Sequence, residues 1–105
     1  MEFENKVILI TGAGSGIGRA AALLYAENGG TVVVSDIDPK GGAETVDMIL
    51  ANGGDASFAH CNVAKYEDVQ QLIETAVERY GKIDVAVNNA GIGGASWNKT
   101  AEHTL

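Results

Sequence analysis

The fold of this chain is decided by one stretch near its N-terminus, Val7-Ile8-Leu9-Ile10-Thr11-Gly12-Ala13-Gly14-Ser15-Gly16-Ile17-Gly18. Its first four residues form a continuous apolar run, which is typical of a strand covered on both faces of a parallel sheet. A glycine-rich turn follows, and the apolar residues after it recur with a helical period. The first N–H groups of a helix have no acceptor within the helix, and with the helix dipole they form an anion site. The stretch therefore predicts a strand, a phosphate-binding turn and a helix.

The spacing of the glycines distinguishes this turn from other phosphate loops. The pattern is T-G-x-x-x-G-x-G, built on Gly12, Gly16 and Gly18. The usual G-x-G-x-x-G fingerprint does not occur, and no Gly-Lys-Ser/Thr follows, which excludes a P-loop. We therefore predict that unpaired backbone amides of residues 12–18, including those of Ser15 and Ile17, hold the diphosphate of a dinucleotide.

Apolar runs at residues 7–10, 31–35, 56–60 and 84–88 alternate with three segments of helical period. This βαβαβαβ order predicts a parallel sheet with right-handed crossovers and strand order 3-2-1-4. The first two helices are then expected on one face of the sheet and the third on the other. The fold class is α/β, a Rossmann-type doubly wound sheet, and residues 1–105 are expected to form a single domain.

Each helix is expected to turn one apolar face toward the sheet, and the small Ala residues of the first helix would permit close approach. The inward residues of the first helix, which ends at Asn28-Gly29, are predicted to be Ile17, Ala20, Ala21 and Leu24. The second helix starts at Asp38-Pro39, ends at Asn52-Gly53, and is predicted to bury Val46, Ile49 and Leu50. The third ends at Gly81, and its predicted stripe is Val69, Leu72, Ile73, Ala76, Val77 and Tyr80.

Asp36 closes the second strand, 18 residues after Gly18. A carboxylate there can accept hydrogen bonds from the adenosine ribose hydroxyls. The same charge would repel a 2′-phosphate by about 4 kcal/mol at ~4 Å and an effective dielectric constant near 20. We therefore predict NAD(H) in preference to NADP(H). The alternative is a carboxylate that caps the next helix, a role for which Asp38 is better placed.

The composition limits the partners and the compartment. The net charge is −7, without a cluster of Lys and Arg, which argues against nucleic acid or an anionic membrane as a partner. Cys61 is the single cysteine, so no internal disulfide forms, and a reducing, cytoplasmic location is expected. His60 and Cys61 lack metal-ligand spacing, and a buried thiol is the simpler interpretation. Neither a signal peptide nor a run of ~18–20 apolar residues is present.

Together these motifs resemble the classical short-chain dehydrogenase/reductase family. The resemblance rests on the glycine pattern, on Asp36, and on two further motifs, Cys61-Asn62-Val63 and Asn88-Asn89-Ala90-Gly91. It implies that Asn62 and Val63 contact the adenine ring. The family more often has Asp at the first of these positions, but an Asn amide can both donate and accept. It also implies that Asn89, Ala90 and Gly91 pass close to the cofactor ribose.

The resemblance implies an acid/base Tyr, a Lys four residues later and an upstream Ser that polarises a carbonyl. Tyr25, Tyr66 and Tyr80 are followed at that distance by Gly29, Gln70 and Asp84. We therefore expect the chain to be the N-terminal, cofactor-binding part of an NAD-dependent alcohol/ketone oxidoreductase, truncated before its catalytic residues and inactive alone. The intact parent is expected to be a homo-oligomer. The fourth strand would be a bare apolar edge, so the chain alone is expected to self-associate and aggregate or to be only partly ordered.

Two other interpretations share every motif. The chain could be a non-catalytic NAD-binding module, or a structural fragment without ligand affinity because the nicotinamide end of the site is missing. A downstream Ser and Tyr-x-x-x-Lys would distinguish the enzyme from the module. Protection of the amides of residues 12–18 by NADH would exclude the fragment.

Overall fold

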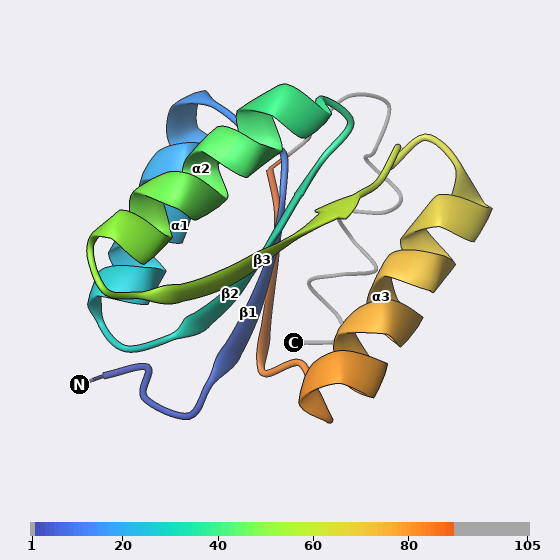
Figure 1. Ribbon diagram of the computed structural model, residues 1–105. Helices are drawn as coiled ribbons and strands as arrows, with labels where there is room; N and C mark the ends of the chain where they lie inside the picture. The colour runs from blue at the N-terminus through green and yellow to red at the C-terminus, as the bar shows by residue number, and fades with distance from the viewer. Residues whose placement is uncertain (1, 90–105) are drawn as a thin grey trace.

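The computed structural model describes residues 2–89, which form a parallel sheet flanked by helices (Figure 1). The elements in chain order are β1 (Val7–Thr11), α1 (Gly16–Glu27), β2 (Thr31–Asp36), α2 (Pro39–Ala51), β3 (Asp55–His60), α3 (Tyr66–Tyr80) and β4 (Val85–Asn88). The strand order is β3-β2-β1-β4 with every neighbouring pair parallel. The predicted Rossmann-type α/β topology is therefore confirmed.

The register brings the carboxyl ends of the strands to one edge of the sheet. Thr11 at the end of β1 pairs with Ser35 of β2 and with Asn88 of β4, and Asp36 pairs with His60. The chain leaves β1 toward β2 and later returns to its other side as β4, so the strand order reverses at β1. In open α/β sheets, ligands bind outside the carboxyl ends at such a reversal.

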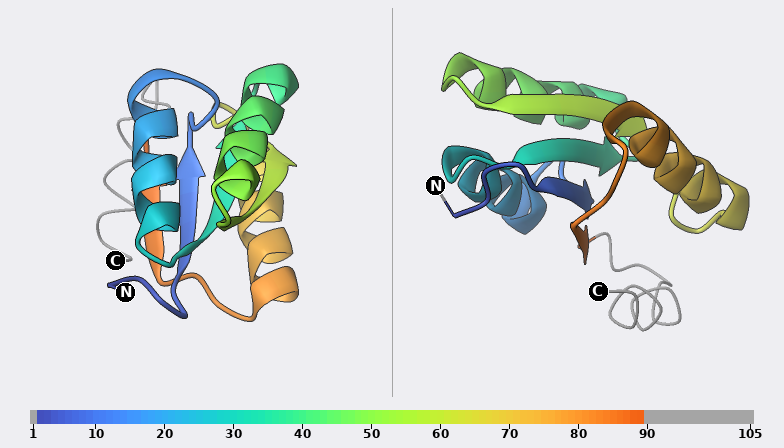
Figure 2. Two further views of the ribbon diagram at one scale, coloured as in Figure 1. Left: turned by 60° about the vertical axis from the view of Figure 1, so that its left-hand side comes forward. Right: turned by 90° about the horizontal axis from the view of Figure 1, so that it is seen from below.

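The sheet is covered on both faces, as Figure 2 shows. Helices α1 and α2 lie on one face, where Ile8 and Ile10 of β1 point into one apolar cluster. Helix α3 lies on the other, where Val7 and Leu9 point into a second cluster. Alternate residues of one strand thus enter two different cores. This explains why the strand is apolar throughout instead of alternating.

The predicted inner face of α1 is wrong for Ile17, Ala20 and Leu24, whereas Ala21 packs against the apolar cluster. The buried residues are Gly18, Ala22 and Ala26, whereas Ile17 and Leu24 are 79% and 59% exposed. The buried set is spaced by four residues and consists of the smallest side chains, which lets the helix axis lie close to the sheet. Gly18 faces the turn and the end of β4, where a Cβ atom would overlap the Gly12 carbonyl oxygen, so this face of α1 must be small.

The prediction for α2 is correct in part. Its ends are as expected, because the Asp38 side chain accepts a hydrogen bond from the Lys40 N–H and Pro39 is the first helical residue. Ile49 is fully buried, but Leu50 is 51% exposed. The inner face instead continues through three small residues, Gly41, Gly42 and Thr45. A helix with such a face can approach the turn after β1 closely.

The stripe predicted for α3 is too wide. Val69, Leu72 and Ala76 are buried and Tyr80 packs beside them, but Ile73 and Val77 are each 42% exposed. The helix ends as predicted at Gly81, which has a left-handed conformation. A single helix on this face of the sheet buries a narrow row of residues, and the flanking apolar positions stay accessible.

Within residues 2–89, no helix is both long and apolar enough to cross a bilayer.

Candidate functional site

The glycine turn lies at the carboxyl edge of the sheet and leads directly into α1. Gly12 and Gly16 have φ values of 66° and 54°, which an L-residue with a side chain rarely adopts. The first hydrogen bond of the helix runs from the Arg19 N–H to the Ser15 carbonyl at 3.1 Å. The amides of residues 15–18 come before that bond, at the electropositive end of the helix, where a negative charge is favoured.

Two amides that we expected to be unpaired are engaged within the protein. The Ala13 N–H donates to the Ser35 carbonyl at 3.0 Å, and the Gly14 N–H donates to Asp36 Oδ2 at 2.8 Å. The prediction of unpaired amides over the whole of residues 12–18 is therefore wrong for these two. The turn must be anchored to β2 to keep its shape, and these two bonds provide the anchor.

Gly18 brings the start of α1 against the beginning of the turn. A Cβ atom at this position would overlap the Gly12 carbonyl oxygen and lie 2.7 Å from Nδ2 of Asn89. The Asn89 amide itself donates to that carbonyl at 3.3 Å. The third glycine of the motif therefore allows close packing of the helix, the turn and the end of β4.

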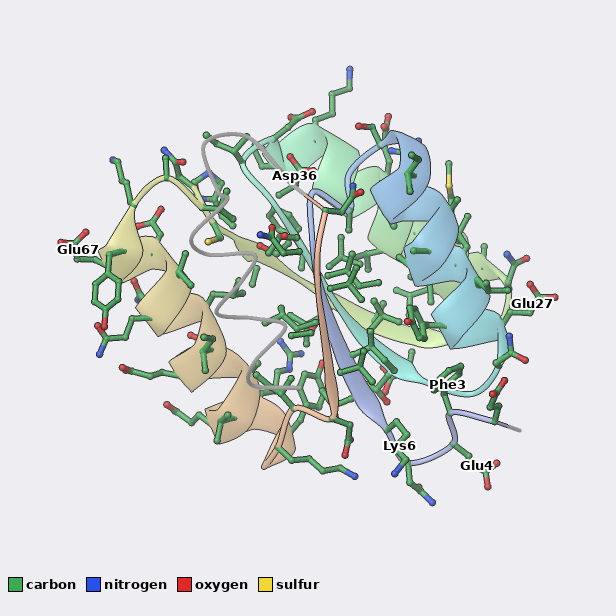
Figure 3. All side chains as sticks on the ribbon, turned by 180° about the vertical axis from the view of Figure 1, so that it is seen from behind. Phe3, Glu4, Lys6, Glu27, Asp36 and Glu67 are labelled. Carbon is green, nitrogen blue, oxygen red and sulfur yellow. The ribbon has the colours of Figure 1, made fainter. Side chains whose placement is uncertain are left out.

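Asp36 is held beside the turn at the end of β2. Its Oδ2 accepts from the Gly14 N–H, and its Oδ1 accepts from the Asp38 N–H at 2.9 Å. Figure 3 shows Asp36 at the carboxyl end of the sheet, with Lys6 at the opposite end. Each carboxylate oxygen has a further lone pair for a ligand hydroxyl. Capping of α2 belongs to Asp38, whose Oδ1 accepts from the Lys40 N–H at 3.1 Å.

Asn62 and Val63 follow β3 at the same edge. The Cys61 N–H donates to the Asp36 carbonyl at 3.2 Å, which ties this segment to β2. The Asn62 N–H donates to Asp68 Oδ2 at 3.0 Å, and Asn62 Oδ1 accepts from the Ala64 N–H at 3.0 Å. The structure thus places Asn62 next to Asp36 along the edge. Of the last motif, Ala90 and Gly91 lie outside the described residues.

The ends of β1 and β4 are joined through Thr11. Its Oγ1 donates to Asn88 Oδ1 at 2.9 Å and accepts from the Asn89 N–H at 3.2 Å. The Asn88 Nδ2 atom is buried and has no hydrogen-bond partner among residues 2–89. Asn88 therefore supports the sheet, whereas Asn89 reaches the glycine turn.

Cys61 is buried between the sheet and α3. Burial raises the pKa of its thiol and the charge of Asp68 adds to this effect, while the Ser35 side chain opposes it. A buried, protonated thiol is a poor nucleophile. In the described part of the chain, no group of three or more His, Cys, Asp or Glu side chains gathers around a common point that could hold a metal ion.

The tyrosines have structural contacts. The Tyr80 hydroxyl lies 2.7 Å from Ser57 Oγ, and the Tyr25 ring packs edge-to-face on Phe3 with ring centroids 4.8 Å apart. Tyr66 is exposed at the start of α3. Tyr80 therefore belongs to the apolar packing, as its place on the helix stripe predicts.

Sequence reasoning missed a group of residues behind the turn. Arg19 of α1 reaches across to α2, where it contacts Gly41, Glu44 and Thr45. No periodicity marks these residues. The one available signal is the Gly41-Gly42 pair in the first turn of a helix, because glycine inside a helix costs stability and usually indicates close approach of another backbone.

A doubly wound parallel sheet with a glycine turn at the reversal of strand order defines a Rossmann-type α/β domain. The family model described as short chain dehydrogenase matches residues 6–104. The chain therefore belongs to the short-chain dehydrogenase family. The resemblance inferred from the glycine pattern, Asp36 and the two later motifs is confirmed.

Three relatives illustrate the similarity. The chain is 50% identical over 104 residues to cyclohexanol dehydrogenase of Acinetobacter sp. (strain SE19), covering 99% of this chain and 41% of that protein. The crystal structure of hydroxysteroid dehydrogenase from Escherichia coli superposes with a TM-score of 0.83 and 40% identity, covering 88% of this chain and 39% of the other. A 7α-hydroxysteroid dehydrogenase complexed with NADH and 7-oxo glycochenodeoxycholic acid has a TM-score of 0.80 and 37% identity, covering 82% and 34%. The chain thus spans between about one third and two fifths of the length of these relatives.

Proposed function

We propose that this chain binds NAD(H) as the dinucleotide-binding part of a short-chain dehydrogenase. The intact protein would transfer a hydride between NAD(H) and an alcohol or ketone. One observation carries the proposal. The open N-terminus of α1 lies beside Asp36 at the carboxyl edge of the sheet, so a diphosphate site and a ribose site are adjacent.

The order of residues along the edge supports the proposal. From β3 to β4 the edge presents Asn62, then Asp36, then the glycine turn, then Asn89. A dinucleotide laid along this edge would meet them as adenine, ribose, diphosphate and nicotinamide ribose. We assign the adenine to Asn62 and Val63, the adenosine ribose to Asp36, and the diphosphate to the turn. The residues assigned to the diphosphate are Gly12, Ser15, Gly16, Ile17 and Gly18, and those assigned to the second ribose are Asn89, Ala90 and Gly91.

The preference for NAD(H) over NADP(H) follows from how Asp36 is held. Both of its oxygens accept backbone hydrogen bonds, so the carboxylate is fixed beside the glycine turn, where we assign the adenosine ribose. A 2′-phosphate would meet this charge at close range. The Arg19 guanidinium pairs with Glu44 at 3.2 Å and is engaged by the turn, so its charge is partly compensated.

NAD(H), when bound, would supply the hydride, and this chain would supply its position and electrostatic environment. Cyclohexanol dehydrogenase and the hydroxysteroid dehydrogenases are named for the oxidation of ring alcohols. We extend that substrate class, a secondary alcohol or its ketone, to the intact protein.

Calorimetric titration of the chain with NADH and with NADPH tests the proposal. We expect NADH to bind at least about tenfold more tightly. Asp36→Asn should weaken NADH binding by about tenfold and bring the two affinities within about threefold, because the repelling charge is gone. Asp47→Asn, the same change at an exposed position of α2, should leave both affinities unaltered.

The outcomes separate the candidates. Equal or tighter binding of NADPH by the unaltered chain would contradict the cofactor preference. Absence of affinity for either dinucleotide would favour a structural fragment without a ligand. Binding of NADH by an intact protein that turns over no alcohol would favour a non-catalytic module.

A further inference from the structure

A side-chain cluster that the cofactor assignment does not use lies behind the glycine turn, on the side of α2. Arg19 Nη2 contacts the Gly14 carbonyl at 2.6 Å and the Gly41 carbonyl at 3.2 Å. Its Nε donates to Thr45 Oγ1 at 2.9 Å. One guanidinium therefore joins the turn after β1 to the first two turns of α2.

Thr45 completes the connection from the other helix. Its side chain is fully buried, and its Oγ1 donates to the Ala13 carbonyl at 2.7 Å while accepting from Arg19. The two successive carbonyls of the turn, those of Ala13 and Gly14, are thus both held from the side of α2. A hydroxyl with one proton and two lone pairs can make this pair of bonds, and a methyl group of the same size cannot.

The orientation of these carbonyls determines the orientation of the amides. The Gly14 carbonyl and the Ser15 N–H belong to one planar trans peptide, in which they point in opposite directions. When Arg19 holds the carbonyl toward α2, the Ser15 N–H is turned away from α2. Ser15 is the residue that precedes α1, so its amide belongs to the anion-binding end of the helix.

We propose that Arg19 and Thr45 are positioning residues that hold the glycine turn in its diphosphate-binding orientation before the cofactor arrives. This inference rests on the proposed function. It assigns to the binding reaction two residues that touch no part of the cofactor themselves. Preorganised donors bind more tightly because the cost of ordering them is met during folding.

The contacts argue against a direct attraction between Arg19 and the diphosphate. The guanidinium lies on the carbonyl side of the Gly14–Ser15 peptide, and its charge is paired with Glu44. The guanidinium of Arg19 is planar and has several donors, arranged as a fork. It therefore contacts the Gly14 carbonyl of the turn, the Gly41 carbonyl of α2 and the Thr45 hydroxyl at the same time. A lysine keeps the charge but has one nitrogen and no fork. Positioning and charge attraction therefore predict opposite results for Arg19→Lys.

The experiment compares two ligands of the complete 105-residue chain. ADP-ribose carries the diphosphate, whereas adenosine reaches only the Asp36 and Asn62 end of the edge. We expect Arg19→Lys and Thr45→Val each to weaken ADP-ribose binding by about tenfold and to change adenosine binding by less than about threefold. Thr45→Ser keeps the hydroxyl and should recover most of the affinity. Arg79→Lys and Thr75→Val on α3 are the matched controls.

A second measurement needs no ligand. In the NMR spectrum of the ¹⁵N-labelled chain, the chemical shift of the Ser15 amide should change in Arg19→Lys and Thr45→Val and should be unaltered in the two controls. Circular dichroism melts of each variant separate a local change from loss of the fold. If Arg19→Lys does not fold, the comparison of Thr45→Val with Thr45→Ser carries the test.

Unchanged ADP-ribose affinity in Arg19→Lys and Thr45→Val would overturn the inference, as would an equal loss for adenosine. Full affinity in Arg19→Lys alone would show that charge and not the fork matters. None of these results for the variants bears on the proposed function, because the unaltered chain would still bind ADP-ribose. Failure of the unaltered chain to bind ADP-ribose would instead overturn the proposed function, and the positioning role with it.

Discussion

The two flanks of β1 differ in how completely the described residues cover them. On the β2 side, the glycine turn is bonded to β2 through Ser35 and Asp36 and to α2 through Thr45. On the β4 side, Thr11 joins the strand ends. Each flank has one buried polar atom without a partner among residues 2–89, Ser35 Oγ on the β2 side and Asn88 Nδ2 on the β4 side. The strand residues of β2 are largely buried, whereas those of β4 are half-buried.

The difference shows which part of the site is self-sufficient. The proposed diphosphate and adenosine-ribose positions lie within one βαβα segment, in which Asp36 and Thr45 hold the turn from 22 and 32 positions away. The β4 side contributes Asn89 to the turn, but the cover of this strand is not found among the described residues. Self-association through the β4 edge stays a prediction.

The largest expected effect is at Gly18. In Gly18→Ala, the added Cβ would overlap the Gly12 carbonyl, and backbone atoms cannot move aside as a flexible side chain can. We expect a loss of about 3 kcal/mol in the free energy of unfolding, measured by urea denaturation. Gly53→Ala is the control, because it places a side chain at φ 83° in open space and should cost about 1 kcal/mol. Similar losses in the two variants would contradict the close packing of the turn.

An intermediate effect compares the two flanks directly. Val34 of β2 and Val87 of β4 pack against the same apolar cluster, but Val34 is fully buried and Val87 is half-buried. We expect Val34→Ala to lower the free energy of unfolding by about 2 kcal/mol and Val87→Ala by about 1 kcal/mol. Denaturation of both variants in urea measures the difference. An equal or larger loss at Val87 would show that the β4 flank is as well packed as the β2 flank.

The smallest expected effect is a dependence on pH at the start of β4. Asp84 Oδ2 accepts from the Val7 N–H at 2.8 Å, and this bond lowers the pKa of the carboxyl, with a further contribution from Lys82. A lowered pKa means that the folded state favours the ionised form. The stabilisation is therefore complete above the unfolded value, about pH 4, and is lost as the pH falls through the lower folded value.

Asp84→Asn should consequently lose less stability than the unaltered chain between about pH 4 and pH 2. Thermal melts at a series of pH values measure the two slopes. Asp47→Asn removes an exposed carboxylate elsewhere and serves as the control. If the melting temperatures of Asp84→Asn and the unaltered chain change with pH in the same way, the Asp84 carboxylate does not stabilise the start of β4.

The fold could be predicted from the sequence because its signals are local. Continuous apolar strands, Asp38-Pro39 at the start of α2 and Gly81 at the end of α3 each act through neighbouring backbone atoms. The place of Asp36 beside the turn followed from the same alternation of strands and helices. The faces of α1 and α2 could not be predicted in this way. Their rotation depends on how closely Gly18 and Gly41 let separate segments approach.

By itself, the sequence determined the order of the strands, the glycine turn at their carboxyl edge and the short-chain dehydrogenase family. Only the tertiary structure decided which amides of the turn remain for a ligand and that Arg19 and Thr45 hold it from behind. The physical reason is the separation along the chain between the residues that interact. A turn and a helix cap are set by adjacent residues, whereas the peptides at Gly14 and Ala13 are also held by Asp36 and Thr45, which lie 22 and 32 positions away along the chain.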